Sequence, residues 1–239
     1  MRRKHPLPTV LDRHEQYALL DQPNPRYPTE HRNLLFLRLQ LDDGLRLPEM
    51  RLLRWQNVNL SSGKLRVEGV EVQDRILWLS KEGLSLARDW RERQKDVLEK
   101  RTASGCDMGR KKWVFTNPNG SKVSRKYLRR MVRENAKDAG INEMVFPYTL
   151  RHTFATDLYL ETGNLRLVQK ALGLPDLAST VIYRRLARRK LKRALSNLPG
   201  ARKVSGGGEM QINPDVRFTR MAVRSETGDR ALEREVRRT

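Results

Sequence analysis

The stretch PYTLRHTFATDLYLETGNLRLVQKALGLPDLASTVIYRRL, residues 147–186, carries helix signals along most of its length. A first helix is predicted over about 149–161, because its apolar residues recur at i, i+4 and i+8: Leu150, Phe154 and Leu158. A second is expected over about 164–172, between a cap-forming asparagine and a glycine. A third is predicted over 177–197, with a break near Tyr183.

Two basic residues fall in the opening turn of the first of these helices. Arg151 flanks the apolar stripe, and a guanidinium there is costly to bury unless an anion meets it. This indicates an anion site around Arg151. The adjacent His152 is interpreted as a packing or capping residue.

The remaining elements predict a mainly α fold with a small antiparallel β-sheet. Helices are expected over about 10–20, 29–41, 82–100 and 125–139, and in the part of 42–55 that begins near Pro48. Strands are expected over 64–69, 75–80 and 113–116.

The composition indicates a polyanionic partner. Lys and Arg number 49 against 28 Asp and Glu, which gives a formal net charge of +21. A protein with so large a positive charge attracts polyanions, and nucleic acid is the default partner. The single Cys106 excludes an internal disulfide and favours a reducing cytosol. No metal-ligand spacing, secretory signal or membrane-length apolar run is present, so no metal and no membrane partner are expected.

Two separated segments resemble one family, the tyrosine recombinases or phage integrase family. DGLRLPEMRLLRWQNVNL (43–60) is similar to the first arginine motif of the family. Residues 147–186 are similar to the second, in which the nucleophilic tyrosine follows the arginine at the family spacing, here 32 residues. The similarity runs from about Leu7 to about Leu198 and implies the catalytic-domain fold of these enzymes.

The resemblance implies DNA cleavage by a tyrosine hydroxyl, giving a 3′-phosphotyrosine and a free 5′-hydroxyl with no metal or other cofactor. Tyr183 matches the nucleophile, and Arg46 and Arg151 match the two arginines that bind the attacked phosphate. Two guanidiniums suit this task because each presents a planar fork to phosphate oxygens. Glu49 matches a residue that supports the site.

Three positions depart from the family pattern. Tyr148 stands where relatives have a histidine, and its phenol can still donate a hydrogen bond to a phosphate oxygen. Leu174 stands where relatives have a histidine or tryptophan, and it has no donor. Relatives carry a general-acid lysine in the turn between two strands, but the matching turn 69–74 has Val70 and no lysine. These changes predict weakened catalysis.

Two basic stretches are candidates for duplex contact. One is a stripe at i, i+4, i+7 and i+11 of the helix over 125–139: Lys126, Arg130, Arg133 and Lys137. The other is RRLARRKLKR (184–193), which begins with Arg184 and Arg185 and holds seven basic residues. In relatives the segment after the tyrosine packs on a neighbouring subunit, so assembly is an alternative role, and a homo-oligomer on DNA is expected.

Residues 1–198 are therefore expected to form a catalytic-like domain without a separate N-terminal core-binding domain, followed by a linker (199–209) and a C-terminal tail (210–239). The preferred function is DNA strand cleavage and rejoining by a cytoplasmic, nucleoid-associated recombinase of a mobile element. One alternative is a catalytically inactive relative that binds DNA as a regulator or accessory factor. The other is a basic helical protein bound to RNA or another partner.

Overall fold

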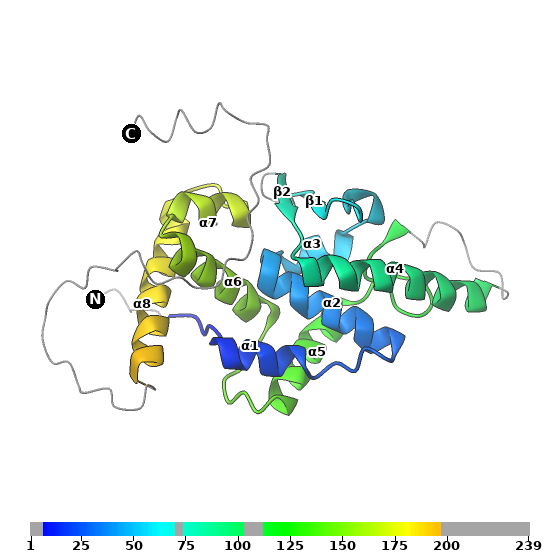
Figure 1. The fold of residues 1–239 in the computed structure, drawn as a ribbon, viewed down its shortest axis with the longest axis horizontal. Helices are drawn as coiled ribbons and strands as arrows, with labels where there is room; N and C mark the ends of the chain where they lie inside the picture. The colour runs from blue at the N-terminus through cyan, green and yellow to red at the C-terminus, as the bar shows by residue number, and fades with distance from the viewer. Residues whose placement is uncertain (1–6, 70–73, 103–111, 197–239) are drawn as a thin grey trace, which may run out of the picture. The chain divides into compact units, whose positions relative to one another are not determined.

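The computed structural model describes residues 7–69, 74–102 and 112–196 (Figure 1). These residues form a mainly helical fold with one two-stranded antiparallel sheet, which confirms the predicted fold class. The elements in chain order are α1 (Arg13–Leu20), α2 (Pro28–Asp43), α3 (Leu47–Leu52), β1 (Lys64–Val67), β2 (Arg75–Trp78), α4 (Lys81–Thr102), α5 (Arg125–Asp138), α6 (Pro147–Thr162), α7 (Leu165–Leu172) and α8 (Val181–Ser196). In the sheet, Leu65 lies opposite Leu77 and Val67 opposite Arg75.

Helix α2 is the centre of the larger core. Its leucines and Phe36 are buried on several sides, as expected of a helix that neighbours cover. It packs against α4 along one side and α6 along another, and Figure 1 shows α4 running beside it. The edge of Phe36 meets the ring of Phe115, with the ring centroids 5.6 Å apart.

Gly44 ends α2 and places the segment that carries Arg46. Its φ of 59° is left-handed, the conformation that glycine adopts at low cost at a helix end. A Cβ built there would come within 2.2 Å of the Phe154 ring on α6. Both the backbone angle and the close approach of α6 therefore require glycine at this position.

A second, smaller core joins α6, α7 and α8. It contains Val10 from the N-terminal segment together with Ala155, Val168, Leu172, Tyr183 and Leu186. The Asn164 side chain caps α7 by accepting from the N–H groups of Arg166 and Leu167, as its sequence position predicts. The capped α7 closes the apolar cluster in which Tyr183 lies.

Two sequence predictions were wrong in detail. Residues 113–116 form no continuous strand but make isolated bridges, Arg54 to Trp113 and Thr116 to Lys122. The pairing partner changes within four residues, so no ladder can form there. The third predicted helix has no break at Tyr183: α8 begins at Val181 after a short 3₁₀ turn, and Tyr183 lies in its first turn.

The predicted linker (199–209) and tail (210–239) lie outside the described residues. Within the described part of the chain, no helix combines the length and the apolar character needed to cross a membrane.

Candidate active site

Arg151 on α6 is buried, with 5% of its surface exposed. One terminal nitrogen donates to the Gly44 carbonyl at 2.6 Å, and the other donates to the Leu172 carbonyl at 2.7 Å. The Glu49 carboxylate lies 3.9 Å away. Burial lowers the pKa of Arg151 to about 10, Glu49 opposes this shift, and Arg75 and Arg46 add to it. The side chain therefore keeps its charge at neutral pH.

Glu49 is held by a second buried arginine that the sequence analysis missed. Arg75 on β2 donates to both carboxylate oxygens, at 2.8 and 2.9 Å, and its Nε donates to the Ala171 carbonyl at 2.7 Å. Glu49 also accepts from the Arg46 N–H at 2.6 Å. A signal existed in the sequence: the alternation of β2 places residue 75 on the buried face, where a guanidinium needs an anionic partner.

Arg46 stands immediately before α3 and is half-buried. Among the described residues its guanidinium has no hydrogen-bond or ion-pair partner. Its charge nevertheless acts on both Arg151 and Tyr183, so the three groups are neighbours in space. Within the described part of the chain, no partner occupies this guanidinium, so it can meet an incoming anion.

Tyr183 projects from the first turn of α8 and is 4% exposed. Burial raises the pKa of its phenol, and the charges of Arg151 and Arg46 partly offset the rise. Its hydroxyl makes no hydrogen bond with a described residue. Its ring packs against that of His152, with the ring centroids 5.8 Å apart and the ring planes inclined by 43°.

Of the three positions that depart from the family pattern, the structure describes two. Tyr148 is 56% exposed in the first turn of α6 and is free to contact a ligand. Leu174 is half-buried and packs against the small core. Val70 lies outside the described residues. Within the described part of the chain, no group of three or more His, Cys, Asp or Glu side chains could hold a metal ion.

The predicted basic stripe on α5 is exposed to solvent. Its members are Lys126, Arg130, Arg133 and Lys137. Of these, Arg130 lies 3.6 Å from Glu134. On α8, Arg184 and Arg185 are also exposed.

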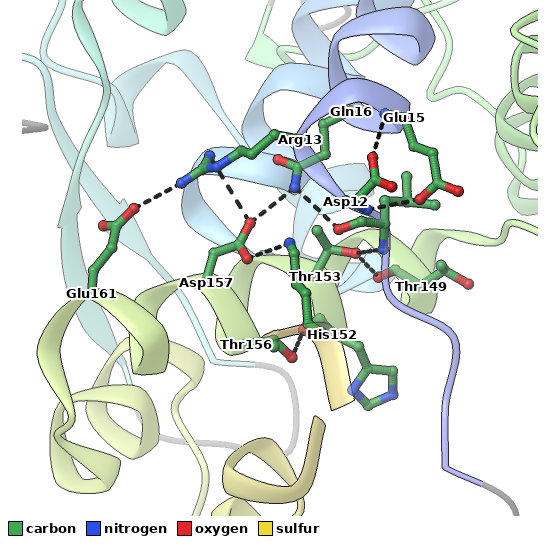
Figure 2. Close-up of polar contacts among 12 residues, drawn as sticks. Asp12, Arg13, Glu15, Gln16, Thr149, His152, Thr153, Thr156, Asp157 and Glu161 are labelled. Carbon is green, nitrogen blue, oxygen red and sulfur yellow. Dashed lines mark hydrogen bonds and ion pairs between the residues drawn. The ribbon is translucent and has the colours of Figure 1, made fainter. Parts of the chain in front are cut away.

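Three cations in the second half of the basic run on α8 are already paired within the molecule. Arg189 donates to backbone carbonyls of the N-terminal segment, at Leu7 and Pro8. Lys190 pairs with Asp157 of α6, and Arg193 pairs with Glu15 of α1 at 3.0 Å. In Figure 2, Asp157 also meets Gln16 and Arg13, which links α1 to α6. These α8 cations hold the fold together, and the sequence alone did not separate them from the exposed ones.

A cation cluster around Trp113 was also missed. Arg54, Lys112 and Lys122 lie over the indole, with their charged atoms 5.1, 5.2 and 4.6 Å from the ring centroid. No ion pair with a described carboxylate balances these three charges. The interleaving of aromatic and basic residues in the sequence was a weak signal for such a surface.

Most of the chain is similar to known proteins. The model of the Phage integrase family matches residues 9–190. Tyrosine recombinase XerD of Staphylococcus saprophyticus is 30% identical over 187 residues, which cover 78% of this chain and 61% of the relative. XerD of Staphylococcus aureus is 31% identical over the same shares. The chain thus spans about three-fifths of the length of the curated relatives it matches.

Solved structures show the same fold. XerA recombinase superposes with a TM-score of 0.63 and 25% identity, over 80% of this chain and 65% of that one. XerH recombinase bound to palindromic difH superposes with a TM-score of 0.64 and 27% identity, over 80% and 54%. A lambda integrase dimer bound to a core site shares the fold at 17% identity, with a TM-score of 0.56, over 76% of this chain and 49% of that one. The chain belongs to the phage integrase family, the tyrosine recombinases.

Proposed function

We propose that the protein cleaves and rejoins double-stranded DNA through a covalent tyrosyl intermediate, in site-specific recombination or integration. The observation that carries the proposal is the convergence of four side chains from separate parts of the chain: Arg46, Glu49, Arg151 and Tyr183. Among the described residues the Arg46 guanidinium has no partner, Arg151 is charged, and the charges of both arginines act on Tyr183. A phosphodiester is the anion that suits two arginines beside a phenol.

The proposed steps use these residues in order. Arg46 and Arg151 bind the non-bridging oxygens of the attacked phosphate and stabilise the charge that redistributes as the bond changes. The Tyr183 oxygen attacks phosphorus, and the 5′-oxygen leaves with the bonding electrons. Tyr148, exposed at the start of α6, donates a hydrogen bond to the same phosphate. Glu49 holds the arginines in place and does not touch DNA.

The exposed basic residues supply affinity for the duplex. The α5 stripe, the Arg184–Arg185 pair and the cations around Trp113 would contact backbone phosphates and release counterions. The family match falls inside residues 1–198, to which we assign the catalytic fold, with 199–209 as a linker and 210–239 as a tail. We assign the protein to DNA in the cytoplasm, at the nucleoid, where it acts as a homo-oligomer.

A second function has observations in its favour: a catalytically inactive DNA-binding regulator. Both terminal nitrogens of Arg151 already donate to backbone carbonyls. Burial disfavours the phenolate of Tyr183, and Leu174 offers no donor. On this view the α5 and α8 cations bind duplex and no covalent step follows.

One experiment separates the two. Duplexes that bind the protein are selected from a random pool and nicked at successive positions near the centre of the bound site. A nick beside the cleavage site releases a short 5′-hydroxyl strand, and the loss of this strand traps any covalent adduct. The adduct is detected on denaturing gels and its linkage site by mass spectrometry.

The matched control pair is Tyr183→Phe and Tyr159→Phe, since Tyr159 is a half-buried tyrosine of the same small core. The proposal expects adduct in the wild type and in Tyr159→Phe, and none in Tyr183→Phe. An adduct that persists in Tyr183→Phe removes the nucleophile assignment. If the protein binds a specific duplex but forms no adduct at any nick position, the regulator function is established instead.

A further inference from the structure

The His152 side chain lies against the ring of Tyr183 but makes no hydrogen bond with a described residue. Its Nδ1 is buried without a partner, and no hydrogen bond is made by either ring nitrogen to a described residue. The Nδ1 of the buried His31 also has no partner, but the Nε2 of that ring lies 3.1 Å from the Leu86 carbonyl, which anchors it. A buried polar atom without a partner costs stability, so its retention at an active site calls for a function. Figure 2 shows the imidazole apart from the polar network around Asp157.

The Tyr183 hydroxyl is the complementary group. It is a donor without a hydrogen bond to any described residue, on a ring that packs against His152. The contact joins α6 to α8, so the two side chains face each other across the small core. Hydrogen bonds of catalytic groups are often long or unformed until substrate is bound, so two side chains in ring contact can form one in the complex.

Other described groups near Tyr183 cannot accept its proton. Arg46 and Arg151 only donate, and both Glu49 oxygens accept from Arg75. Neutral imidazole can accept. Burial lowers the pKa of His152, and the adjacent Arg151 lowers it further, so the ring is unprotonated at neutral pH. Apart from these groups, α7 brings only the exposed Arg166 and Lys170.

We propose that His152 accepts the phenol proton of Tyr183 during DNA cleavage. As the bond from Oη to phosphorus forms, the proton passes to Nδ1. The bond from phosphorus to the 5′-oxygen breaks, and this oxygen takes the electron pair and a proton from water. In rejoining, the 5′-hydroxyl attacks and loses its proton to solvent, while the imidazolium returns its proton to the departing tyrosyl oxygen. The inference rests on the proposed cleavage function and adds the residue that handles the nucleophile's proton.

The test is single-turnover cleavage of the nicked duplex at saturating protein. His152→Asn keeps a hydrogen-bond acceptor but cannot take a proton, and His152→Ala opens space for added imidazole. Loss of a general base typically lowers the rate by about 10²- to 10⁴-fold. We expect such a loss in both variants, with unchanged affinity for the duplex, and partial recovery of His152→Ala in imidazole. The wild-type rate should fall as pH drops through the imidazole pKa, and His152→Asn should lack this fall.

His31→Asn is the matched control, because His31 is a buried imidazole on α2 whose ring stacks on Trp90. Circular dichroism verifies the fold of each variant. A duplex with sulfur in place of the bridging 5′-oxygen distinguishes the direction of transfer, since a thiolate leaves without a proton. The defect of His152→Asn should persist on this duplex, and its disappearance would assign His152 to the leaving group and overturn the proposal.

If wild type and a folded His152→Asn cleave at equal rates, this inference is overturned but the proposed function is not. If His152→Asn does not fold, His152→Gln and imidazole rescue of His152→Ala decide the matter, and failure of rescue with a folded protein counts against the proton-acceptor role. Absence of adduct in the wild type would instead remove the proposed function, and this inference with it.

Discussion

Replacing Glu49 by glutamine should remove a large part of the protein's stability. The Glu49 side chain is 1% exposed and its partner Arg75 is 7% exposed, so the pair is screened little by solvent. The substitution leaves two buried guanidiniums, of Arg75 and Arg151, without the anion between them. Breaking a buried pair by removing one partner costs about 3–5 kcal/mol. Glutamine retains one acceptor oxygen, so we expect a loss of about 3 kcal/mol, near the lower end of that range.

The free energy of unfolding is measured by urea denaturation followed by circular dichroism, with thermal unfolding as a second readout. For a unit of this size, a loss of about 3 kcal/mol lowers Tm by about 6–12 °C. Glu161→Gln is the matched control, because Glu161 pairs with Arg13 at 2.8 Å but their side chains are 39% and 54% exposed. An exposed pair of this kind contributes less than about 1 kcal/mol.

Equal losses for Glu49→Gln and Glu161→Gln would refute the reasoning, as would a loss below about 1 kcal/mol for Glu49→Gln. Either result would mean that the charge of Glu49 is not what keeps the two arginines in the core. A large loss confined to Glu49→Gln would establish the buried pair as the support of the arginine site.

Three further predictions follow from particular contacts. Gly44→Ala should lower the free energy of unfolding by at least about 1 kcal/mol, because alanine is strained at a positive φ and its Cβ would press against Phe154. If urea denaturation shows no loss of unfolding free energy, this close approach is excluded. Burial raises the pKa of Asp43 well above its ordinary value, so the folded state binds the proton more tightly and stability should fall as pH rises from the unfolded pKa toward the folded one. Asp43→Asn should therefore be more stable than the wild type at pH 8, with the difference vanishing near pH 4; a difference independent of pH would contradict this. Lys122→Ala should reduce the slope of log duplex affinity against log salt by about 1, whereas the control Lys95→Ala, whose amine pairs with Glu92, should leave it unchanged.

Local signals explain why much of the fold could be predicted. The asparagine at position 164 was an expected cap, and it accepts backbone N–H groups at the start of α7. Capping and apolar periodicity act over three or four residues, so they can be recognised within one short segment of sequence. The paired arginine motifs likewise indicated that Arg46, Arg151 and Tyr183 belong to one site.

The ion-pair partners of charged residues could not be predicted from the local sequence. The seven basic residues of 184–193 looked alike, yet Lys190 and Arg193 are paired with Asp157 and Glu15, while Arg184 and Arg185 face solvent. The identity of a partner far along the chain depends on how helices pack, and no local period encodes it.

The sequence by itself determined the family and the helical class, and it predicted that Arg46, Arg151 and Tyr183 form one site, because these follow from residue types at short or family-specific spacings. Only the tertiary structure decided that Arg75 neutralises Glu49, that Arg46 has no side-chain partner among the described residues, and that His152 meets Tyr183. The reason is physical. A buried charge or a buried imidazole takes its role from the few atoms that packing brings within hydrogen-bond or ring contact, and those atoms come from elements far apart in the chain.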